Sequence, residues 1–226
     1  MIKNKISHIF FDLDHTLWDF ETNSNLTFQK IFKECEVDLS VEKFMVHYTP
    51  INHRYWKMYR DNKIEQEELR YSRLKDTFQA IKVDASDELI NLLSEQYILN
   101  LSDQTALLPY AKEILTYLKD KYQLHIITNG FDKIQYKKLK NSAIDNYFKT
   151  VTTAEEVTYK KPHPKVFYHA LNKAQADKKE SLMIGDNLEA DIHGAIQIGM
   201  DAIHLANGDN YHKQSIRQLD ELKQYL

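Results

Sequence analysis

Glycine is absent from a long central stretch of this chain of 226 residues. All five glycines lie beyond residue 129, and Pro50 is the only proline between Leu17 and Leu108. Because glycine and proline most often interrupt regular structure, this stretch can form long helices. Its apolar residues recur at the three- and four-residue spacing of amphipathic helices rather than alternating as in a strand. The stretch is therefore predicted to be a small helical bundle.

Single residues mark features of these predicted helices. Ser40 and Ser86 each precede an apolar helical pattern and are predicted N-caps, because their hydroxyls can accept from the free N–H groups of a first turn. Pro50 predicts a break or kink. Cys35, the one cysteine of the chain, is expected to pack as a small apolar residue on a helix face.

The remainder of the chain alternates short apolar runs with helical patterns. The predicted strands cover 8–11, 124–128, 150–152, 182–184 and 202–205, and the predicted helices cover 110–121, 132–140, 164–173 and 188–198. Continuous apolar strands separated by helices are typical of a parallel sheet covered on both faces. We therefore predict an α/β fold with a Rossmann-like parallel-sheet core, formed by residues 1–16 and 104–226, and an inserted helical domain at 17–103.

Polar residues follow the predicted strands where each strand ends. Ligands of an open parallel sheet bind beyond the carboxyl ends of its strands, so these side chains should gather at one edge. Lys160 and Lys161 both lie near this edge, and the position of Lys161 beside Pro162 favours it. The predicted group consists of Asp12, Asp14, Thr128, Asn129, Gly130, Lys161, Asp186 and Asp191.

Such a group indicates phosphate chemistry that uses a metal ion. Carboxylates that lie close together need a cation or protons to neutralise them. Oxygen ligands, without a cluster of histidines or cysteines, favour Mg²⁺ over zinc. A lysine, a threonine hydroxyl and backbone amides can bind phosphate oxygens. Together these groups predict phosphoryl transfer.

The order of these residues adds a family resemblance that spans nearly the whole chain. The runs Asp12-x-Asp14-x-Thr16, Thr128, Lys161-Pro162 and Gly185-Asp186-x4-Asp191 resemble the four ordered motifs of the haloacid dehalogenase superfamily, in the subfamily with a helical cap inserted after the first motif. Dehalogenases of this superfamily lack the aspartate found here at Asp14, because a leaving halide needs no proton. The resemblance therefore implies a phosphatase.

The resemblance also implies a role for each residue. Asp12 would be the nucleophile that forms an aspartyl-phosphate, and Asp14 would protonate the leaving oxygen and later deprotonate water. The inserted helices would form a mobile cap. The remaining implied roles are Mg²⁺ binding by Asp12, the backbone carbonyl of Asp14 and Asp186, phosphoryl binding by Thr128 and Lys161, and support of the lysine or the metal's water shell by Asp191. The backbone amides of Asn129 and Gly130 are predicted, from their place after the strand, to donate to phosphate oxygens as well.

Two local runs narrow the resemblance to a substrate class. The run from Phe11 to Phe20 and the run from Ile126 to Phe131 look like the bacterial pyrimidine 5′-nucleotidases. His15 stands where many relatives carry glycine, and the segment before Lys161 departs from the pattern of that branch. Trp18, close behind the first motif, is predicted to stack on a base at the mouth of the site.

Three other functions remain open at this stage. A broad sugar-phosphate or phosphoglycolate-type phosphatase of the same fold would carry the same motifs, and those of a phosphomutase overlap them almost completely. A catalytically silent binding module is also conceivable, although the intact set of Asp12, Asp14, Thr128, Lys161 and Asp186 argues against it.

Composition limits the partners and the compartment. The formal net charge is −3, and no block of like charge suggests a nucleic-acid surface. No apolar run approaches a membrane-spanning length, and no signal peptide is recognisable at the start. One cysteine excludes an intrachain disulfide, which suits a reducing compartment. We expect a cytoplasmic protein whose partner is a small phosphate ester; the oligomeric state is left open.

Overall fold

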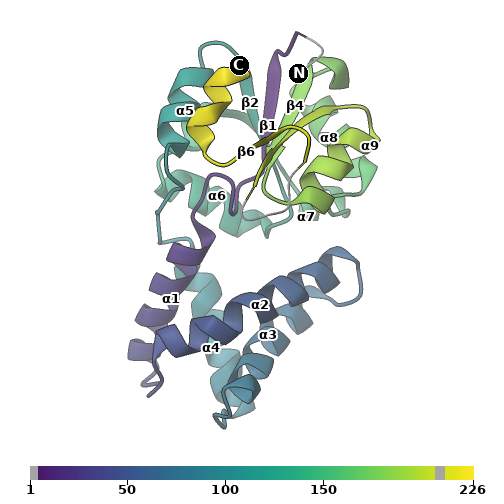
Figure 1. Cartoon of the computed structure of the whole chain (residues 1–226). Helices are drawn as coiled ribbons and strands as arrows, with labels where there is room; N and C mark the ends of the chain where they lie inside the picture. Colours follow the sequence, from purple (N-terminus) through teal and green to yellow (C-terminus); the bar gives the residue numbers. More distant parts are fainter. Residues whose placement is uncertain (1–4, 207–211) are drawn as a thin grey trace. The chain divides into compact units, whose positions relative to one another are not determined.

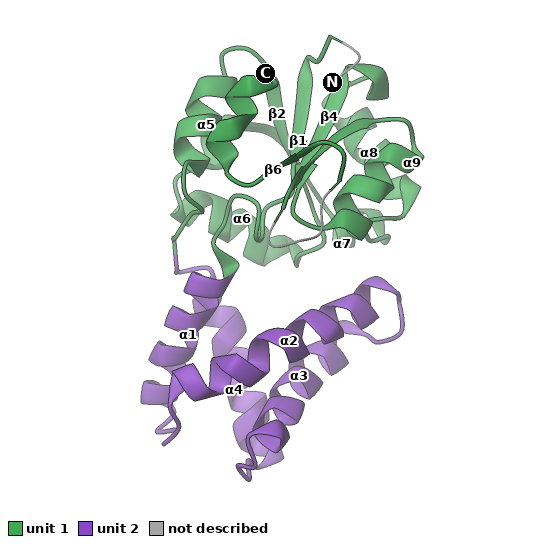
Figure 2. Ribbon diagram, viewed as in Figure 1, with its two compact units in different colours: residues 1–20, 105–226 green, residues 21–104 purple. Residues whose placement is uncertain are grey.

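The computed structural model describes residues 5–206 and 212–226, which divide into two units (Figure 1). Residues 1–20 and 105–226 form the first unit, and residues 21–104 form the second (Figure 2). No helix among the described residues is both long enough and apolar enough to span a membrane.

The first change of unit falls at residue 20, whereas the sequence places it after Thr16. The reason lies in the backbone of the residues in between. The Leu108 N–H donates to the Leu17 carbonyl at 2.9 Å, and the Asp19 N–H donates to the carbonyl of Ala106 at 3.0 Å. Because the outgoing and returning chains bond to each other here, residues 17–20 stay with the first unit.

Six parallel strands make up the sheet of the described part of the first unit, in the order β3-β2-β1-β4-β5-β6. Their bounds are β1 His8–Phe11, β2 Gln123–Thr128, β3 Phe148–Thr153, β4 Ser181–Gly185, β5 Asp201–Leu205 and β6 Ser215–Ile216. Every residue of β1 and β4 is buried, as their continuous apolar sequences predict. From β1 the chain adds β2 and β3 on one side, and from β4 it adds β5 and β6 on the other. The order therefore reverses between β1 and β4, and ligands of such sheets bind at this switch point.

Helices cover both faces of this sheet, which confirms the predicted α/β fold. Figure 1 shows α5 and the C-terminal η4 on one side, and α8 and α9 on the other. An apolar cluster that includes Phe10, Phe167, Met183 and Ile192 joins the second group to the sheet. The helices of this unit are α5 Ala111–Leu118, α6 Asp132–Asn141, η1 Asp145–Tyr147, α7 Ala154–Val157, α8 Pro164–Ala174, η2 Lys178–Glu180, η3 Leu188–His193, α9 Gly194–Gln197 and η4 Leu219–Gln224.

The helix predicted at 188–198 is divided in the structure. Its first part, η3, is a π-helix, in which the Ile192 N–H donates to the Asn187 carbonyl at 3.3 Å. Such wide turns are rare and often lie at functional sites. Gly199 then ends the segment with φ of +84°, a value that glycine adopts without steric cost, as predicted for this position.

The second unit consists of four helices, as its lack of glycine predicts. They are α1 Phe20–Glu34, which begins at the last residue of the first unit, α2 Val41–Arg60, α3 Gln66–Ala80 and α4 Asp87–Leu101. The Ser40 hydroxyl accepts from the Lys43 N–H, and the Ser86 hydroxyl accepts from the Leu89 N–H, so both predicted N-caps are confirmed. The helix α2 continues through Pro50, so the chain does not break there.

Two buried histidines pair at the end of the sheet where β1 begins. The His8 Nδ1 lies 3.0 Å from the His125 Nε2, and the His125 Nδ1 lies 2.9 Å from the Thr150 Oγ1. The His125 ring also stacks on Phe10, with ring centres 4.6 Å apart. Burial, and secondarily the charge of His8, lowers the pKa of His125 to about 4. His125 is therefore neutral in the folded chain at neutral pH.

Acid should destabilise the fold through this pair. The unfolded chain gains the proton of His125 near pH 6.5 but the folded chain only near pH 4, so folding stability is lost as the pH falls between these values. Replacing His125 by leucine should make the loss of unfolding free energy between pH 7 and pH 4 smaller by about 1–2 kcal/mol. Urea unfolding of both chains from pH 7 to pH 4 measures the difference, and parallel curves would contradict the assignment.

Candidate active site

Asp12 follows β1 directly and lies at the carboxyl edge of the sheet. Its N–H continues the ladder by donating to the Ile184 carbonyl of β4 at 2.9 Å. The next residues turn tightly, with the N–H groups of Leu17 and Trp18 both donating to the Leu13 carbonyl. His15 has φ of +63° in this turn, the left-handed region that favours glycine. The turn places Asp12 and Asp14 on the same loop.

Lys161 is the cation of this edge. Its Nζ lies 2.6 Å from Asp12 Oδ1 and 2.7 Å from Asp191 Oδ1, and it donates to the Ile127 carbonyl at 2.7 Å. Its backbone is fixed as well: its N–H donates to Asn129 Oδ1 at 2.8 Å, and its carbonyl accepts from Asn129 Nδ2 at 3.0 Å. Of the two lysines left open by the sequence, the structure places Lys161 in the site.

Asp186 and Asp191 complete a group of carboxylates with Asp12, in which Asp12 and Asp191 are buried and Asp186 is partly exposed. One oxygen from each of the three lies within 4.8 Å of the others. Thr16 Oγ1 donates to Asp186 Oδ1 at 3.3 Å and accepts from the Asp186 N–H at 3.1 Å. His204 Nε2 lies 2.8 Å from the Asp186 carbonyl and donates to it. The sequence predicts the carboxylates at this edge but assigns no role to Thr16 or His204.

The charge of this group is not balanced by Lys161 alone. Burial raises the pKa of Asp12 to about 7, although Lys161 opposes this effect and Asp191 adds to it. Burial and the charges of Asp12 and Asp191 raise the pKa of Asp186 well above its ordinary value. Burial lowers the pKa of Lys161, but Asp12 and Asp191 outweigh it and raise that pKa overall. An oxygen-only group with excess negative charge fits Mg²⁺.

The Asp14 carboxylate contacts α6. Its Oδ1 accepts from Lys138 Nζ at 2.6 Å, and its Oδ2 accepts from Gln135 Nε2 at 2.8 Å. Both α6 side chains are buried, with 2% and 1% of their surface exposed. Sequence reasoning missed both residues; their three-residue spacing, which places them on one helix face, is the only signal that could have found them.

The loop after β2 is arranged differently from the prediction. The Gly130 N–H, predicted to bind phosphate, donates instead to Thr128 Oγ1 at 3.1 Å. The Asn129 side chain is engaged with the backbone of Lys161. Thr128 lies at the strand end as predicted. The loop thus uses its own polar groups to hold Thr128 and Lys161 in place.

Trp18 does not lie at the mouth of the site, so that prediction is wrong. Its side chain is fully buried, with 0% exposed. Its Nε1 donates to the Ser142 hydroxyl at 3.2 Å, and the Lys138 Nζ lies 4.2 Å from its ring centre. Its backbone bridges to Leu107 of the returning chain, which turns the indole into the first unit. Trp18 is a packing residue.

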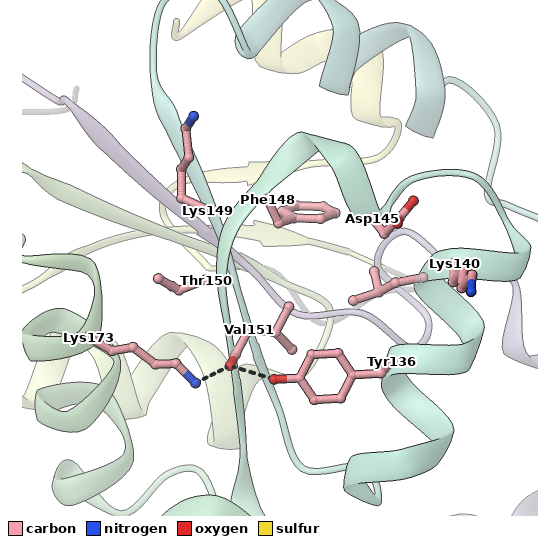
Figure 3. A pocket seen from close by; sticks show the side chains of 9 residues that line it. Tyr136, Lys140, Asp145, Phe148, Lys149, Thr150, Val151 and Lys173 are labelled. Atoms are coloured by element: carbon pink, nitrogen blue, oxygen red, sulfur yellow. Dashed lines mark hydrogen bonds between the residues drawn. The ribbon is translucent and has the colours of Figure 1, made fainter.

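A surface hollow of about 440 Å³ lies elsewhere, beside the edge strand β3. Tyr136 from α6 and Lys173 from α8 both direct their polar ends to the Val151 carbonyl (Figure 3). None of the site carboxylates lines the hollow. The chemistry-bearing residues are therefore not in this depression.

Comparison with known proteins agrees with this geometry. The chain belongs to the family of haloacid dehalogenase-like hydrolases, whose model matches residues 9–205. It is 31% identical to the pyrimidine 5′-nucleotidase YjjG of Escherichia coli over 193 residues, which cover 85% of this chain and 82% of that protein. It is 34% identical to the pyrimidine 5′-nucleotidase PynA of Streptococcus pneumoniae over 210 residues, which cover 88% and 85%.

A solved structure extends the similarity to the whole fold. The HAD-hydrolase YfnB of Bacillus subtilis, in a form bound to magnesium, superposes with a TM-score of 0.88 at 26% identity and covers 98% of both chains. Hydrolases of this family generally use a divalent metal ion, which agrees with the grouped carboxylates of Asp12, Asp186 and Asp191.

Without a divalent metal, Asp12 should lower the free energy of unfolding as the pH rises from about 4 to about 7, a contribution opposite in sign to that of His125. The folded chain keeps the proton of Asp12 up to a pKa of about 7, whereas the unfolded chain loses it near 3.8. Measured by urea unfolding as the difference from Asp12→Asn, the wild type should lose about 1–3 kcal/mol over this range. The histidine pair is present in both chains and cancels.

Millimolar Mg²⁺ should restore the stability that the wild type loses near pH 7, because ionised carboxylates bind the ion. It should have little effect on the free energy of unfolding near pH 4, where the carboxylates are protonated. If Asp12→Asn and the wild type showed the same pH dependence, Asp12 would not be the group whose pKa is raised.

Proposed function

We propose that the chain is a Mg²⁺-dependent phosphomonoester hydrolase that acts through an aspartyl-phosphate on Asp12, and that its substrates are pyrimidine nucleoside 5′-monophosphates. The main observation is the buried ammonium of Lys161 2.6 Å from Asp12, inside a group of carboxylates. The names of two relatives, both pyrimidine 5′-nucleotidases, support the substrate class.

The residues divide the reaction into two steps. A carboxylate oxygen of Asp12 attacks phosphorus, the bond to the ester oxygen breaks, and Asp14 gives that oxygen its proton. Water then attacks the phosphorus of the aspartyl-phosphate and gives a proton to Asp14. The bond between phosphorus and the Asp12 oxygen breaks, which frees the Asp12 carboxylate and releases inorganic phosphate. Lys161 neutralises charge at Asp12 during both steps.

Asp12, Asp186 and the backbone carbonyl of Asp14 would hold Mg²⁺, with Asp191 supporting Lys161. When bound, the ion supplies positive charge to the phosphoryl oxygens. Thr128 would donate its hydroxyl proton to one of those oxygens.

We also propose that residues 21–104 act as a cap. The segment is inserted between β1, which carries Asp12 at its end, and α5. In YfnB, the magnesium-bound crystal form reveals interdomain movement. We also propose a cytoplasmic location, which the single cysteine supports. The formal net charge of −3 supports the proposal that the protein does not bind nucleic acid.

Chelation should abolish hydrolysis of an aryl phosphate, and Mg²⁺ should restore it. Asp12→Asn should lower kcat by on the order of 10³-fold or more, because an amide is not a nucleophile. The matched control is Asp120→Asn, at an exposed aspartate of the same unit, which should keep the wild-type rate. Full activity in excess chelator, or of Asp12→Asn, would overturn the mechanism.

Among natural esters, UMP, dUMP and dTMP should exceed purine monophosphates and sugar phosphates in kcat/KM by about tenfold or more, a difference of about 1.4 kcal/mol in transition-state binding. Because Trp18 is buried, Trp18→Ala should lower the folded fraction and reduce activity on all substrates in equal proportion. If the wild type preferred sugar phosphates over every nucleotide, the proposed nucleotidase activity would be wrong and only the proposed phosphatase activity would stand.

A further inference from the structure

The side-chain amide of Gln135 joins two residues of the site. Its Nε2 donates to Asp14 Oδ2 at 2.8 Å and to Thr128 Oγ1 at 2.7 Å. An amide nitrogen carries two protons, so both are used in these two bonds. Gln135 thus connects the residue assigned to acid-base chemistry with the residue assigned to phosphate binding.

Asp14 fixes which way this amide points. A flipped amide would turn its oxygen toward Asp14 and would lose the hydrogen bond that Nε2 donates to Asp14 Oδ2 at 2.8 Å. Lys138 Nζ holds the other oxygen of Asp14 at 2.6 Å, so both oxygens of this carboxylate are bound to α6. The nitrogen of Gln135 must therefore face Asp14 and Thr128.

The orientation of the amide in turn fixes the hydroxyl proton of Thr128. A hydroxyl has two lone pairs and one proton. Gln135 donates to Thr128 Oγ1 from one side, and the Gly130 N–H donates to it at 3.1 Å from another. Because both lone pairs are occupied, the proton of Thr128 can serve only as a donor to a further acceptor.

We propose that Gln135 is a positioning residue that holds Thr128 as a hydrogen-bond donor for the phosphoryl group. This inference rests on the proposed function, because it assumes that phosphate binds at Asp12 and Thr128.

Gly130 supports the proposal by leaving room for the amide. A Cβ added at Gly130 would lie 2.0 Å from Gln135 Nε2. Real carbon atoms do not approach so closely, so the amide packs directly against bare backbone. The conformation of the loop after β2 therefore depends on glycine at position 130 beside the Gln135 amide.

The test measures binding of inorganic phosphate in the presence of Mg²⁺ by calorimetry. Gln135→Met keeps an unbranched side chain of similar length and removes both donors. It should raise the Kd for phosphate about tenfold, within the range found when groups that orient a binding residue are removed. Thr128→Val should have a similar effect, and the double variant should bind no more weakly than the weaker single variant, because both changes remove one interaction.

Two further variants separate positioning from packing. Thr128→Ser keeps the hydroxyl, and in that background Gln135→Met should again weaken phosphate binding. Ser142→Ala also removes a buried hydrogen bond beside α6, the one from Trp18, and should lower the thermal stability without changing the Kd for phosphate. An unchanged Kd in Gln135→Met, or additive effects with Thr128→Val, would overturn the proposal.

Turnover of the wild type distinguishes this inference from the proposed function. If the wild type binds phosphate with the expected coupling but hydrolyses no ester, the proposed function fails and the role of Gln135 stands. If the wild type hydrolyses esters but Gln135→Met binds phosphate normally, the inference alone fails. A wild type that binds no phosphate overturns both.

Discussion

The candidate site depends on one buried ammonium. Lys161 is 1% exposed, and burying an unpaired lysine costs several kcal/mol, so its position requires Asp12 and Asp191 beside it. The carboxylates need the lysine for the same reason. Three carboxylates share this one cation, so the group carries excess negative charge. Burial, with the charge of Asp191 adding to it, raises the pKa of Asp12 to about 7. The same imbalance makes the site suitable for a divalent cation.

The sequence was sufficient to predict which strands bring this group together. In a parallel sheet, residues that follow buried strands meet at the same edge whatever the helices between them do. Asp12 after β1, and Asp186 and Asp191 after β4, could therefore be placed from the apolar runs alone. The π-helical turn at Leu188–His193 could not, because its hydrogen bonds differ from those of an α-helix while its apolar pattern does not.

The faces of short helices were not predictable in the same way. The helix α6 is rich in lysine and reads as solvent-exposed, yet Gln135 and Lys138 are buried because Asp14 accepts hydrogen bonds from both. Trp18 failed for a related reason. Its closeness to Asp14 in sequence suggested the mouth of the site, but pairing of its backbone with the returning chain turns it inward. Whether such a side chain is buried depends on its own tertiary contacts, which the spacing of apolar residues in the sequence does not predict.

Burial of Trp18 has a consequence for substrate choice. The carboxylates, Lys161 and Thr128 all belong to residues 1–20 and 105–226, so this unit accounts for phosphate chemistry on any ester. Stacking needs an accessible ring face, which Trp18 lacks. A preference for pyrimidines must therefore come from side chains other than Trp18.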